Sequence, residues 1–259
     1  MNEELPKEAK KTAWRPHSCG VLSERILRTV FHWLVIKGCR LLYTVSCRVH
    51  VVELATVPRH GMLIMASNHI SHFDPPIMSG FFPRRLDWMA MGELFGTPFW
   101  RGVFTRLNCI PVDRGGGDRT SLRTALHRLQ DGRVIGIFPE GGIRAGEWSI
   151  LNGAEMKPGL VALSIMSGAP VIPCALIGSD QLYKPSNWLR RTDIYLLIGS
   201  AVEPPKEDAR QPGARDRFAA DLSSAFTSLK DEMVTRFALQ PEDLPQTPQA
   251  RKGIHDLAN

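Results

Sequence analysis

The chain has 259 residues, of which 43% are hydrophobic and 22% are charged, an ordinary globular composition. That length suits one large domain or two small ones with a sizeable core. The composition excludes a wholly disordered, collagen-like or disulfide-framework protein. The apolar stretches fall short of the roughly 20 residues that a membrane-spanning helix needs. The five cysteines are scattered and form no C-x-x-C pair, so we expect reduced thiols in a cytosolic setting.

The net charge of +6 is concentrated near the N-terminus, since residues 1–60 carry ten Lys or Arg against five Asp or Glu. A basic segment is typical of a solubilising tail, of nucleic-acid binding or of contact with an anionic membrane. From Val21 to Tyr43 the pattern predicts an amphipathic helix. Its apolar residues are Leu22, Ile26, Val30, Trp33, Leu34, Leu41 and Leu42, and its cations are Arg25, Arg28, Lys37 and Arg40. Such a helix either lies in a membrane interface or packs on the protein's own core.

Strand-like and helical segments alternate along the rest of the chain. We expect strands at Arg48–Leu54, Met62–Ala66, Leu86–Met91, Cys109–Val112, Val134–Phe138, Val171–Ile177 and Ile194–Ile198, and helices at 75–82, 93–101, 118–131, 157–167 and 214–238. This alternation predicts an α/β fold with a mostly parallel central sheet flanked by helices. We expect a basic lead-in and an amphipathic, membrane-associating helix at 1–45, the α/β domain at 46–240, and a disordered tail at 241–259.

The first candidate for chemistry is the turn after the expected strand at Met62–Ala66. His69 and Asp74 are five positions apart, so a straight helix would not aim them together but a turn would. Pro75 disfavours helical backbone at Asp74. We predict that His69 is a general base for a hydroxyl and that Asp74 holds its other ring nitrogen. With no G-x-S-x-G in the chain, the nucleophile is expected to be the substrate. The alternative is that Asp74 only caps a helix.

A metal site is a further alternative for the same turn. His69, His72 and Asp74 form an H-x-x-H-x-D pattern of metal-ligand residue types. The spacing matches no common zinc signature, and no later histidine cluster completes a site. We therefore expect no metal.

A second turn with chemical potential follows the strand at Val134–Phe138. It contains Glu140, Gly141 and Arg144, and its glycines let the backbone expose N–H groups to an oxyanion or phosphate. Arg144 offers a bidentate donor for phosphate, and Arg114, after the strand at Cys109–Val112, offers another. Each turn alone also fits a plain loop with solvated side chains.

Taken in order, these segments resemble the glycerolphosphate and lysophosphatidate acyltransferase superfamily over about residues 45–200. His69 to Asp74 resembles its H-x4-D block, Asn108 to Arg114 its second block, Phe138 to Arg144 its F-P-E-G-T-R block, Lys157-Pro158-Gly159 its K-x-G, and Val171 to Pro173 its V-I-P block. The third block departs from the family pattern, because Gly142 stands where Thr is usual and Ile143 lengthens the gap to Arg144 by one residue.

The resemblance implies transfer of a fatty acyl group from acyl-CoA or acyl-carrier protein to an acceptor hydroxyl, with no metal or other cofactor. It implies catalysis by His69 and Asp74, and substrate binding by Arg114, Glu140, Gly141, Arg144 and Lys157. The expected acceptor is 1-acylglycerol 3-phosphate and the product phosphatidate. The expected place is the cytoplasmic face of a membrane, with lipids and no nucleic acid as partners. The alternatives are a same-fold acyltransferase for another lipid or alcohol acceptor, and a non-catalytic lipid-binding membrane protein.

Overall fold

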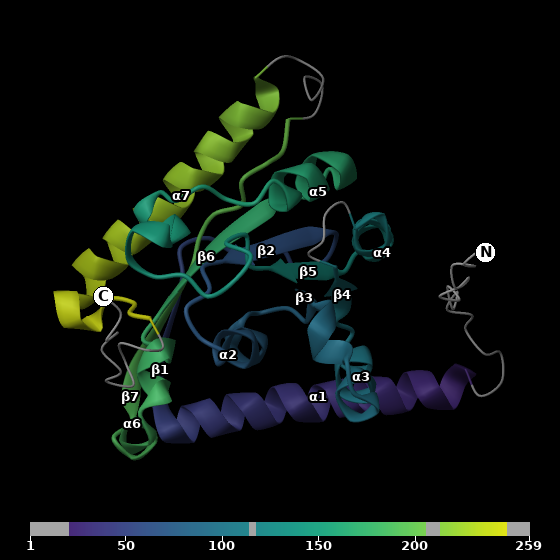
Figure 1. Ribbon diagram of the computed structural model, residues 1–259, viewed down its shortest axis with the longest axis horizontal. Helices are drawn as coiled ribbons and strands as arrows, with labels where there is room; N and C mark the ends of the chain where they lie inside the picture. The colour runs from purple at the N-terminus through teal and green to yellow at the C-terminus, as the bar shows by residue number, and fades with distance from the viewer. Residues whose placement is uncertain (1–20, 114–117, 206–212, 248–259) are drawn as a thin grey trace, which may run out of the picture.

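The computed structural model of the chain describes residues 21–113, 118–205 and 213–247. In that part of the chain a seven-stranded sheet has the order β1-β7-β6-β2-β5-β3-β4 (Figure 1). The strands are β1 (Cys47–Glu53), β2 (Leu63–Ser67), β3 (Leu86–Met91), β4 (Ile110–Val112), β5 (Val134–Ile137), β6 (Val171–Ile177) and β7 (Thr192–Ile198). Every described pair is parallel except β6 with β7. The predicted mixed α/β fold with a mostly parallel central sheet is confirmed.

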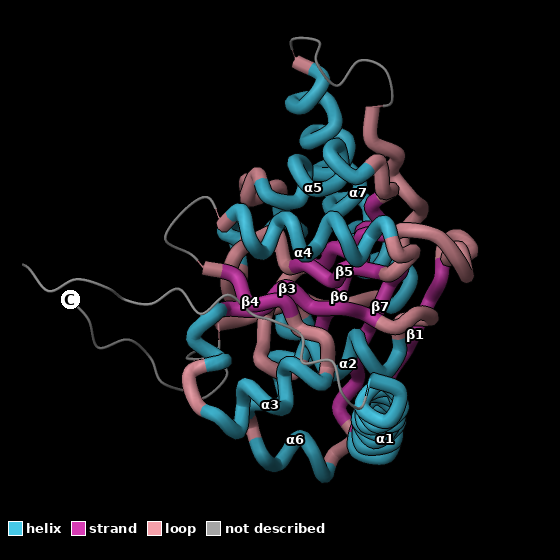
Figure 2. The backbone as a smooth tube through the Cα atoms, turned by 90° about the vertical axis from the view of Figure 1, so that its right-hand side faces the viewer, coloured by secondary structure: helices cyan, strands magenta, loops and turns pink. Residues whose placement is uncertain are grey.

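Helices cover both faces of the sheet. The helices are α1 (Val21–Ser46), α2 (Asp74–Phe81), α3 (Pro98–Arg106), α4 (Arg119–Gln130), α5 (Gly159–Ser167), α6 (Pro185–Leu189) and α7 (Ala214–Phe237). Figure 2 shows α4, α5 and α7 on one face and α1, α2, α3 and α6 on the other. Since both faces are covered, β2 and β6 are buried at every residue, which explains their uninterrupted apolar sequences.

The sheet separates two apolar cores. Ile64 and Ala66 of β2 belong to the core under α4, α5 and α7, where Phe226 is fully buried. Leu63 and Met65 point the opposite way and join the core under α1 and α2. This is the two-residue alternation of a strand, and it places β2 at the centre of the molecule.

Helix α1 packs directly on α2. A Cβ atom on Gly80 of α2 would lie 3.2 Å from the backbone N and Cα of Arg40, so a larger residue there would push the two helices slightly apart. Tyr43 and His32 are buried on the inner side of α1. Residues 1–20 of the expected lead-in lie outside the described part of the chain.

The helix expected at 93–101 is divided in the structure. A 3-10 turn occupies Gly92–Phe95, and α3 begins only at Pro98. Proline is well placed in a first helical turn because it lacks an N–H group, and the Thr97 side chain accepts a hydrogen bond from the Trp100 N–H. Helix α6 was not predicted.

Part of the tail expected at 241–259 is described as far as residue 247. It contains a 3-10 turn at Pro241–Asp243, and the Gln246 N–H donates to the Asp180 carboxylate at 3.0 Å. Residues 248–259 lie outside the described ranges.

Candidate active site

The candidate site lies where three parallel strands end. Ala66 of β2 pairs with Ile137 of β5, and Ser67 pairs with Cys174 of β6. The segments that follow these strands therefore emerge at the same edge of the sheet, which is where ligands bind in open α/β folds. His69 follows β2 and Glu140 follows β5, so the strand register alone places them side by side.

His69 and Asp74 are in direct contact, as the sequence predicted. His69 Nδ1 lies 2.8 Å from Asp74 Oδ2. A carboxylate only accepts hydrogen bonds, so Nδ1 carries the proton and Nε2 presents a lone pair. The His69 side chain is 17% exposed, and no described residue forms a hydrogen bond to its Nε2. The imidazole is thus oriented with its basic nitrogen available to a substrate.

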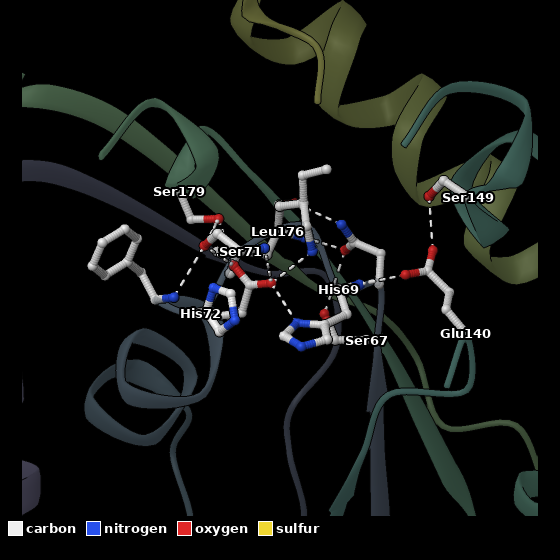
Figure 3. Close-up of polar contacts among 12 residues, drawn as sticks. Ser67, His69, Ser71, His72, Glu140, Ser149, Leu176 and Ser179 are labelled. Carbon is white, nitrogen blue, oxygen red and sulfur yellow. Dashed lines mark hydrogen bonds and ion pairs between the residues drawn. The ribbon is translucent and has the colours of Figure 1, made fainter. Parts of the chain in front are cut away.

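Asp74 is itself held from several sides. Its side chain is fully buried, and Oδ2 also accepts from the N–H groups of Ile70 (2.7 Å) and Ser71 (2.8 Å). Oδ1 accepts from the hydroxyls of Ser71 (2.9 Å) and Ser179. Figure 3 shows Ser71 and Ser179 gathered on this side of His69. Five hydrogen-bond donors fix the carboxylate, and together they offset the free-energy cost of burying its charge.

The alternative that Asp74 is merely a helix cap fails on this geometry. Helix α2 begins at Asp74 itself, and the residue at its N-cap, Phe73, makes no side-chain capping bond. The Asp74 carboxylate instead accepts from the N–H groups that precede α2 and from the imidazole. The turn between β2 and α2 thus brings the carboxylate into contact with the histidine.

Asn68 anchors the same turn to the sheet. Its side-chain amide donates to the Leu176 carbonyl (2.9 Å), and its side-chain oxygen accepts from the Leu176 N–H (2.8 Å). Both bonds are buried and join the end of β2 to β6. The residue before His69 is therefore locked, which limits the freedom of the histidine backbone.

The Glu140 carboxylate holds the His69 backbone from the other side. Its Oε2 accepts from the His69 N–H at 2.7 Å, and its Oε1 accepts from Ser149 Oγ and from the Ile150 N–H, both at 2.9 Å. The His69 carbonyl in turn accepts from the Arg144 N–H at 2.8 Å. Burial is the largest influence on Glu140 and raises its pKa to about 7, although these hydrogen bonds act in the opposite direction.

Aromatic stacking fixes the plane of the imidazole. The ring of Phe138, at the end of β5, stacks on the His69 ring with centroids 4.1 Å apart, and Trp88 of β3 stacks on Phe138 at 4.7 Å. Phe138, Glu140 and Arg144 belong to the same turn, so one segment contacts the ring, the N–H and the carbonyl of His69.

The glycine turn offers backbone donors. The Gly141 N–H already donates to the Phe138 carbonyl at 3.1 Å, whereas the N–H groups of Gly142 and Ile143 have no partner among the described residues. Gly141 has a positive φ of 69°, and a Cβ atom there would lie 3.3 Å from Cγ of Lys157. The Lys157 side chain therefore crosses the turn at Gly141.

A family model described as Acyltransferase matches residues 48–177, which is half of the chain. The chain belongs to the acyltransferase family. Among curated relatives, "1-acyl-sn-glycerol-3-phosphate acyltransferase" of Bacillus subtilis is 28% identical over 184 residues, covering 71% of this chain and 87% of the relative. "N-acylphosphatidylethanolamine synthase" of Arabidopsis thaliana is 34% identical over 124 residues, covering 44% and 42%.

A solved structure shares the fold of this acyltransferase. The crystal structure of the 1-acyl-sn-glycerophosphate (LPA) acyltransferase from Thermotoga maritima aligns with a TM-score of 0.55 at 20% identity, covering 83% of this chain and 84% of that one. The family match makes the chain an acyltransferase enzyme.

The acyltransferase brings most of the residues predicted from sequence to one edge of the sheet. These are His69, Asp74, Glu140, Gly141, Arg144 and Lys157. The side chains of Arg144 and Lys157 are exposed there. Arg114 lies outside the described residues.

The metal alternative gains no support from the arrangement of this turn. His72 Nδ1 lies 2.6 Å from the hydroxyl of Tyr183, so the His72 ring contacts this tyrosine and not the pair formed by His69 and Asp74. Within the described ranges, no three His, Cys, Asp or Glu side chains are placed to hold a metal ion.

Neither the contact of Ser179 with Asp74 nor that of Asn68 with Leu176 was predicted from the sequence. Ser179 follows Gly178, just after β6, and its hydroxyl donates to Asp74. The signal for it was available, because the carboxyl end of a third parallel strand at the same edge predicts further polar contacts there.

Proposed function

We propose that this acyltransferase moves a fatty acyl group from a thioester donor, acyl-CoA or acyl-carrier protein, to the hydroxyl of a lysophospholipid. The observation that carries the proposal is the 2.8 Å contact of His69 with a fully buried Asp74. Two exposed cations, Arg144 and Lys157, lie at the same edge of the sheet. The names of the bacterial relatives support 1-acylglycerol 3-phosphate as acceptor and phosphatidate as product.

In the proposed mechanism, Nε2 of His69 accepts the proton of the acceptor hydroxyl as the oxygen attacks the thioester carbonyl. Asp74 stabilises the imidazolium that forms. The tetrahedral intermediate then expels the thiolate, which takes the proton from His69. The new C–O bond replaces the C–S bond, and the histidine returns to its starting state.

Backbone N–H groups of Gly142 and Ile143 are our candidates for stabilising the oxyanion. They belong to the turn that holds His69, and a good donor in such a position is worth roughly 3–4 kcal/mol in the transition state. Arg144 and Lys157 are the proposed ligands of the acceptor phosphate, because both are exposed at the edge where His69 lies. Arg114 stays a predicted third ligand.

Glu140 has a positioning role in this proposal. The sequence assigned it to the acceptor, yet both of its oxygens accept from donors inside the protein. It is 4% exposed. Its contribution is therefore to hold the His69 peptide, and the acceptor is bound by the exposed cations.

We also propose that the enzyme docks on the cytoplasmic face of a membrane through one apolar face. This apolar face consists of Ile26, Leu27, Val30, Trp33, Leu34, Leu41, Leu42 and Val45 of α1, Phe99 and Trp100 of α3, and Leu189 of α6, each between 46% and 89% exposed. The three helices lie on the same side of the sheet (Figure 2). Many exposed apolar side chains on one side of a protein are typical of an interaction site, and exposed Lys37 and Arg40 on α1 suit anionic lipid.

Among the described residues, no helix combines the length and the apolarity that crossing a bilayer requires. We propose that the apolar face contacts one leaflet. Helix α2, whose first residue is Asp74, packs on α1, so the proposed docking places the site close to the lipid surface.

A different lipid acceptor is the second candidate. Gly142 and Ile143 depart from the family pattern in the turn beside His69. The Arabidopsis relative, with a different lipid in its name, is consistent with acceptor variation on this fold.

The deciding experiment is an acceptor panel with radiolabelled acyl-CoA and, in parallel, acyl-carrier protein. We expect 1-acylglycerol 3-phosphate to give the highest kcat/KM, with a radiolabelled diacyl product. A higher kcat/KM for a lysophospholipid without a terminal phosphate would favour the second candidate. Thioester cleavage no faster than background with every acceptor would support a non-catalytic lipid-binding protein.

A further inference from the structure

Four arginines gather at the edge of the sheet opposite to His69. Arg28 lies on α1, Arg85 precedes β3, Arg128 is in the last turn of α4 and Arg133 precedes β5. We call these four residues the arginine cluster. Because β3 and β5 run parallel to β2, their first residues lie away from the catalytic end of the sheet.

Asp87 is the one described carboxylate that forms ion pairs with the arginine cluster. Asp87 is 1% exposed and accepts from Arg128 Nη1 at 3.1 Å and from Arg133 Nη2 at 2.6 Å. Arg28 and Arg85 form no ion pair with any described carboxylate. Four guanidinium groups against one carboxylate leave positive charge in excess.

The other two arginines have neutral partners. Arg85 Nε donates to Nδ1 of buried His32 at 2.7 Å, and Arg28 Nη2 donates to the Thr105 carbonyl at 2.7 Å. Burial, followed by the charge of Arg85, lowers the pKa of His32 to about 4, so this histidine stays neutral. Arg28 Nε is buried and has no hydrogen-bond partner. The arginine cluster therefore contains an unsatisfied N–H donor and more positive charge than Asp87 neutralises, and an anionic ligand would compensate for both.

Asn108 joins the two halves of the cluster. Its side-chain amide lies 3.2 Å from His32 Nδ1, and its carbonyl accepts from Arg128. Arg28 is one helical turn from His32 on α1 and so shares its inward side. The four guanidinium groups therefore belong to one connected set of contacts.

The chemistry of the cluster suits a phosphate. Guanidinium groups remain charged at all ordinary pH values and present forked pairs of donors that match phosphate oxygens. Burial, followed by the charges of Arg128 and Arg133, lowers the pKa of Arg28, although Asp87 acts in the opposite direction. The cluster is accessible, since Arg85 is exposed and the Arg133 side chain is 35% exposed.

We propose that the arginine cluster binds the phosphate group of an anionic phospholipid in the bilayer on which the enzyme docks. Arg28 and its partner Thr105 lie where α1 meets α3, and both helices carry the apolar face on their outer sides. A phosphate beside these helices is at the level of the lipid headgroups. The assignment of the phosphate to a bilayer lipid rests on the proposed membrane docking. The inference that the arginine cluster binds a phosphate group does not depend on it.

The test compares wild type with the variant Arg28→Gln/Arg85→Gln, which leaves Asp87 and both of its ion pairs in place. The control, Arg215→Gln/Arg217→Gln, removes the same charge from exposed positions on α7, on the other face of the sheet. Flotation is measured at constant salt with phosphatidylcholine vesicles, with and without about one-fifth phosphatidylglycerol. We expect the cluster variant to lose about tenfold or more of the binding that phosphatidylglycerol adds, and the control to lose less than about twofold.

A charge-preserving variant separates a built site from diffuse attraction. Arg28→Lys/Arg85→Lys keeps the charge but loses the forked donors, so we expect it to lose most of the added binding as well. Lysine or glutamine variants that bind like wild type would overturn the proposal.

Two further measurements separate lipid binding by the arginine cluster from binding of free phosphate and from the proposed acyltransferase function. Inorganic phosphate is expected to raise the Tm of wild type above that in chloride of equal ionic strength, and to raise the Tm of the glutamine variant less. A phosphate effect without any change in vesicle binding would overturn the lipid assignment. Acyl transfer in detergent is expected to be unchanged in the cluster variant, so loss of this site and failure of the proposed function remain separable.

Discussion

His69 is held at its ring, its N–H and its carbonyl by residues of a single turn. Phe138 stacks on the ring, Glu140 accepts from the N–H, and the Arg144 N–H donates to the carbonyl. Asp74 adds the bond that selects the tautomer. This arrangement fixes the direction of Nε2 before a substrate arrives, which is the requirement for an efficient general base.

Replacing Glu140 tests whether it positions the histidine or binds the acceptor. We expect Glu140→Gln to lower kcat by about 10²-fold with little change in the KM of the acceptor, because a misplaced base slows the chemical step. Steady-state kinetics with varied acceptor measures both constants. Glu147→Gln, an exposed glutamate in the following segment, is the matched control. A raised acceptor KM at unchanged kcat would assign Glu140 to the substrate instead.

The same residue predicts a pH dependence of stability. Burial raises the Glu140 pKa from 4.5 to about 7, so its contribution to stability is fully present below about pH 4.5 and is lost as pH rises through 7. Relative to wild type, Glu140→Gln should therefore gain on the order of 3 kcal/mol in free energy of unfolding between pH 4 and pH 8. Urea titrations of both proteins measure this difference, and a gap independent of pH would contradict it.

At the scale of elements, helices α1 and α3 act together on one side of the sheet. Their outward residues form the apolar face, while inward residues such as Tyr43 and His32 tie α1 to the domain. Packing of α1 on the protein's own core is therefore observed, and its exposed apolar residues leave the proposed membrane contact open to the tests below.

Substitutions on α3 test the membrane contact at a site away from the N-terminal helix. We expect Phe99→Ser/Trp100→Ser to weaken binding to neutral phosphatidylcholine vesicles by about tenfold or more, since two large exposed aromatic side chains lose their contact with lipid. Vesicle flotation measures the fraction of each protein that is bound to the vesicles. Trp148→Ser is the control, because Trp148 is 69% exposed and adjoins the segment at Ile150–Asn152 that packs on α7. Equal binding by wild type and the α3 variant would remove α3 from the docking surface.

Local sequence patterns predicted most elements of the fold. The strand at Val171–Ile177 has the same bounds in the structure because its buried apolar run ends at a glycine. The helix expected at 93–101 was divided because a proline begins a new helix at position 98. That difference depends on backbone geometry, which a count of apolar residues does not contain.

The candidate site could be predicted where the residues in contact are close together in the sequence. His69 and Asp74 are near neighbours joined by a turn, and Pro75 marks that turn. The positioning role of Glu140 was not predictable, because its partners Ser149 and Ile150 meet it only after the segment between them folds back. The arginine cluster was missed for the same reason, since its members come from α1, α4 and the starts of two strands.

At the scale of the whole molecule, the core under α7 reaches the candidate site through Ile150, which is buried in that core and whose N–H donates to Glu140. Phe226 is fully buried in that core. We expect Phe226→Ala to lower the free energy of unfolding by about 3–5 kcal/mol through lost burial and the cavity that remains. Activity per folded molecule should be close to that of wild type. Denaturant titration together with active-site counting measures both.

Ser224→Ala, at an exposed position on the same helix, is the control and should change stability by less than about 0.5 kcal/mol. If Phe226→Ala stays fully folded but loses turnover, the packing around Phe226 also positions the turn that holds His69, which would contradict this prediction.

The general-base role of His69 is the claim on which the account depends, and paired histidine variants test it most directly. We measure acyl transfer to 1-acylglycerol 3-phosphate by wild type, His69→Ala and His72→Ala, each checked for folding by its circular dichroism spectrum and Tm. The account predicts that His69→Ala folds and loses about 10³-fold or more of kcat, while His72→Ala, whose ring contacts Tyr183, retains most of it. A folded His69→Ala protein with turnover near that of wild type would contradict the account.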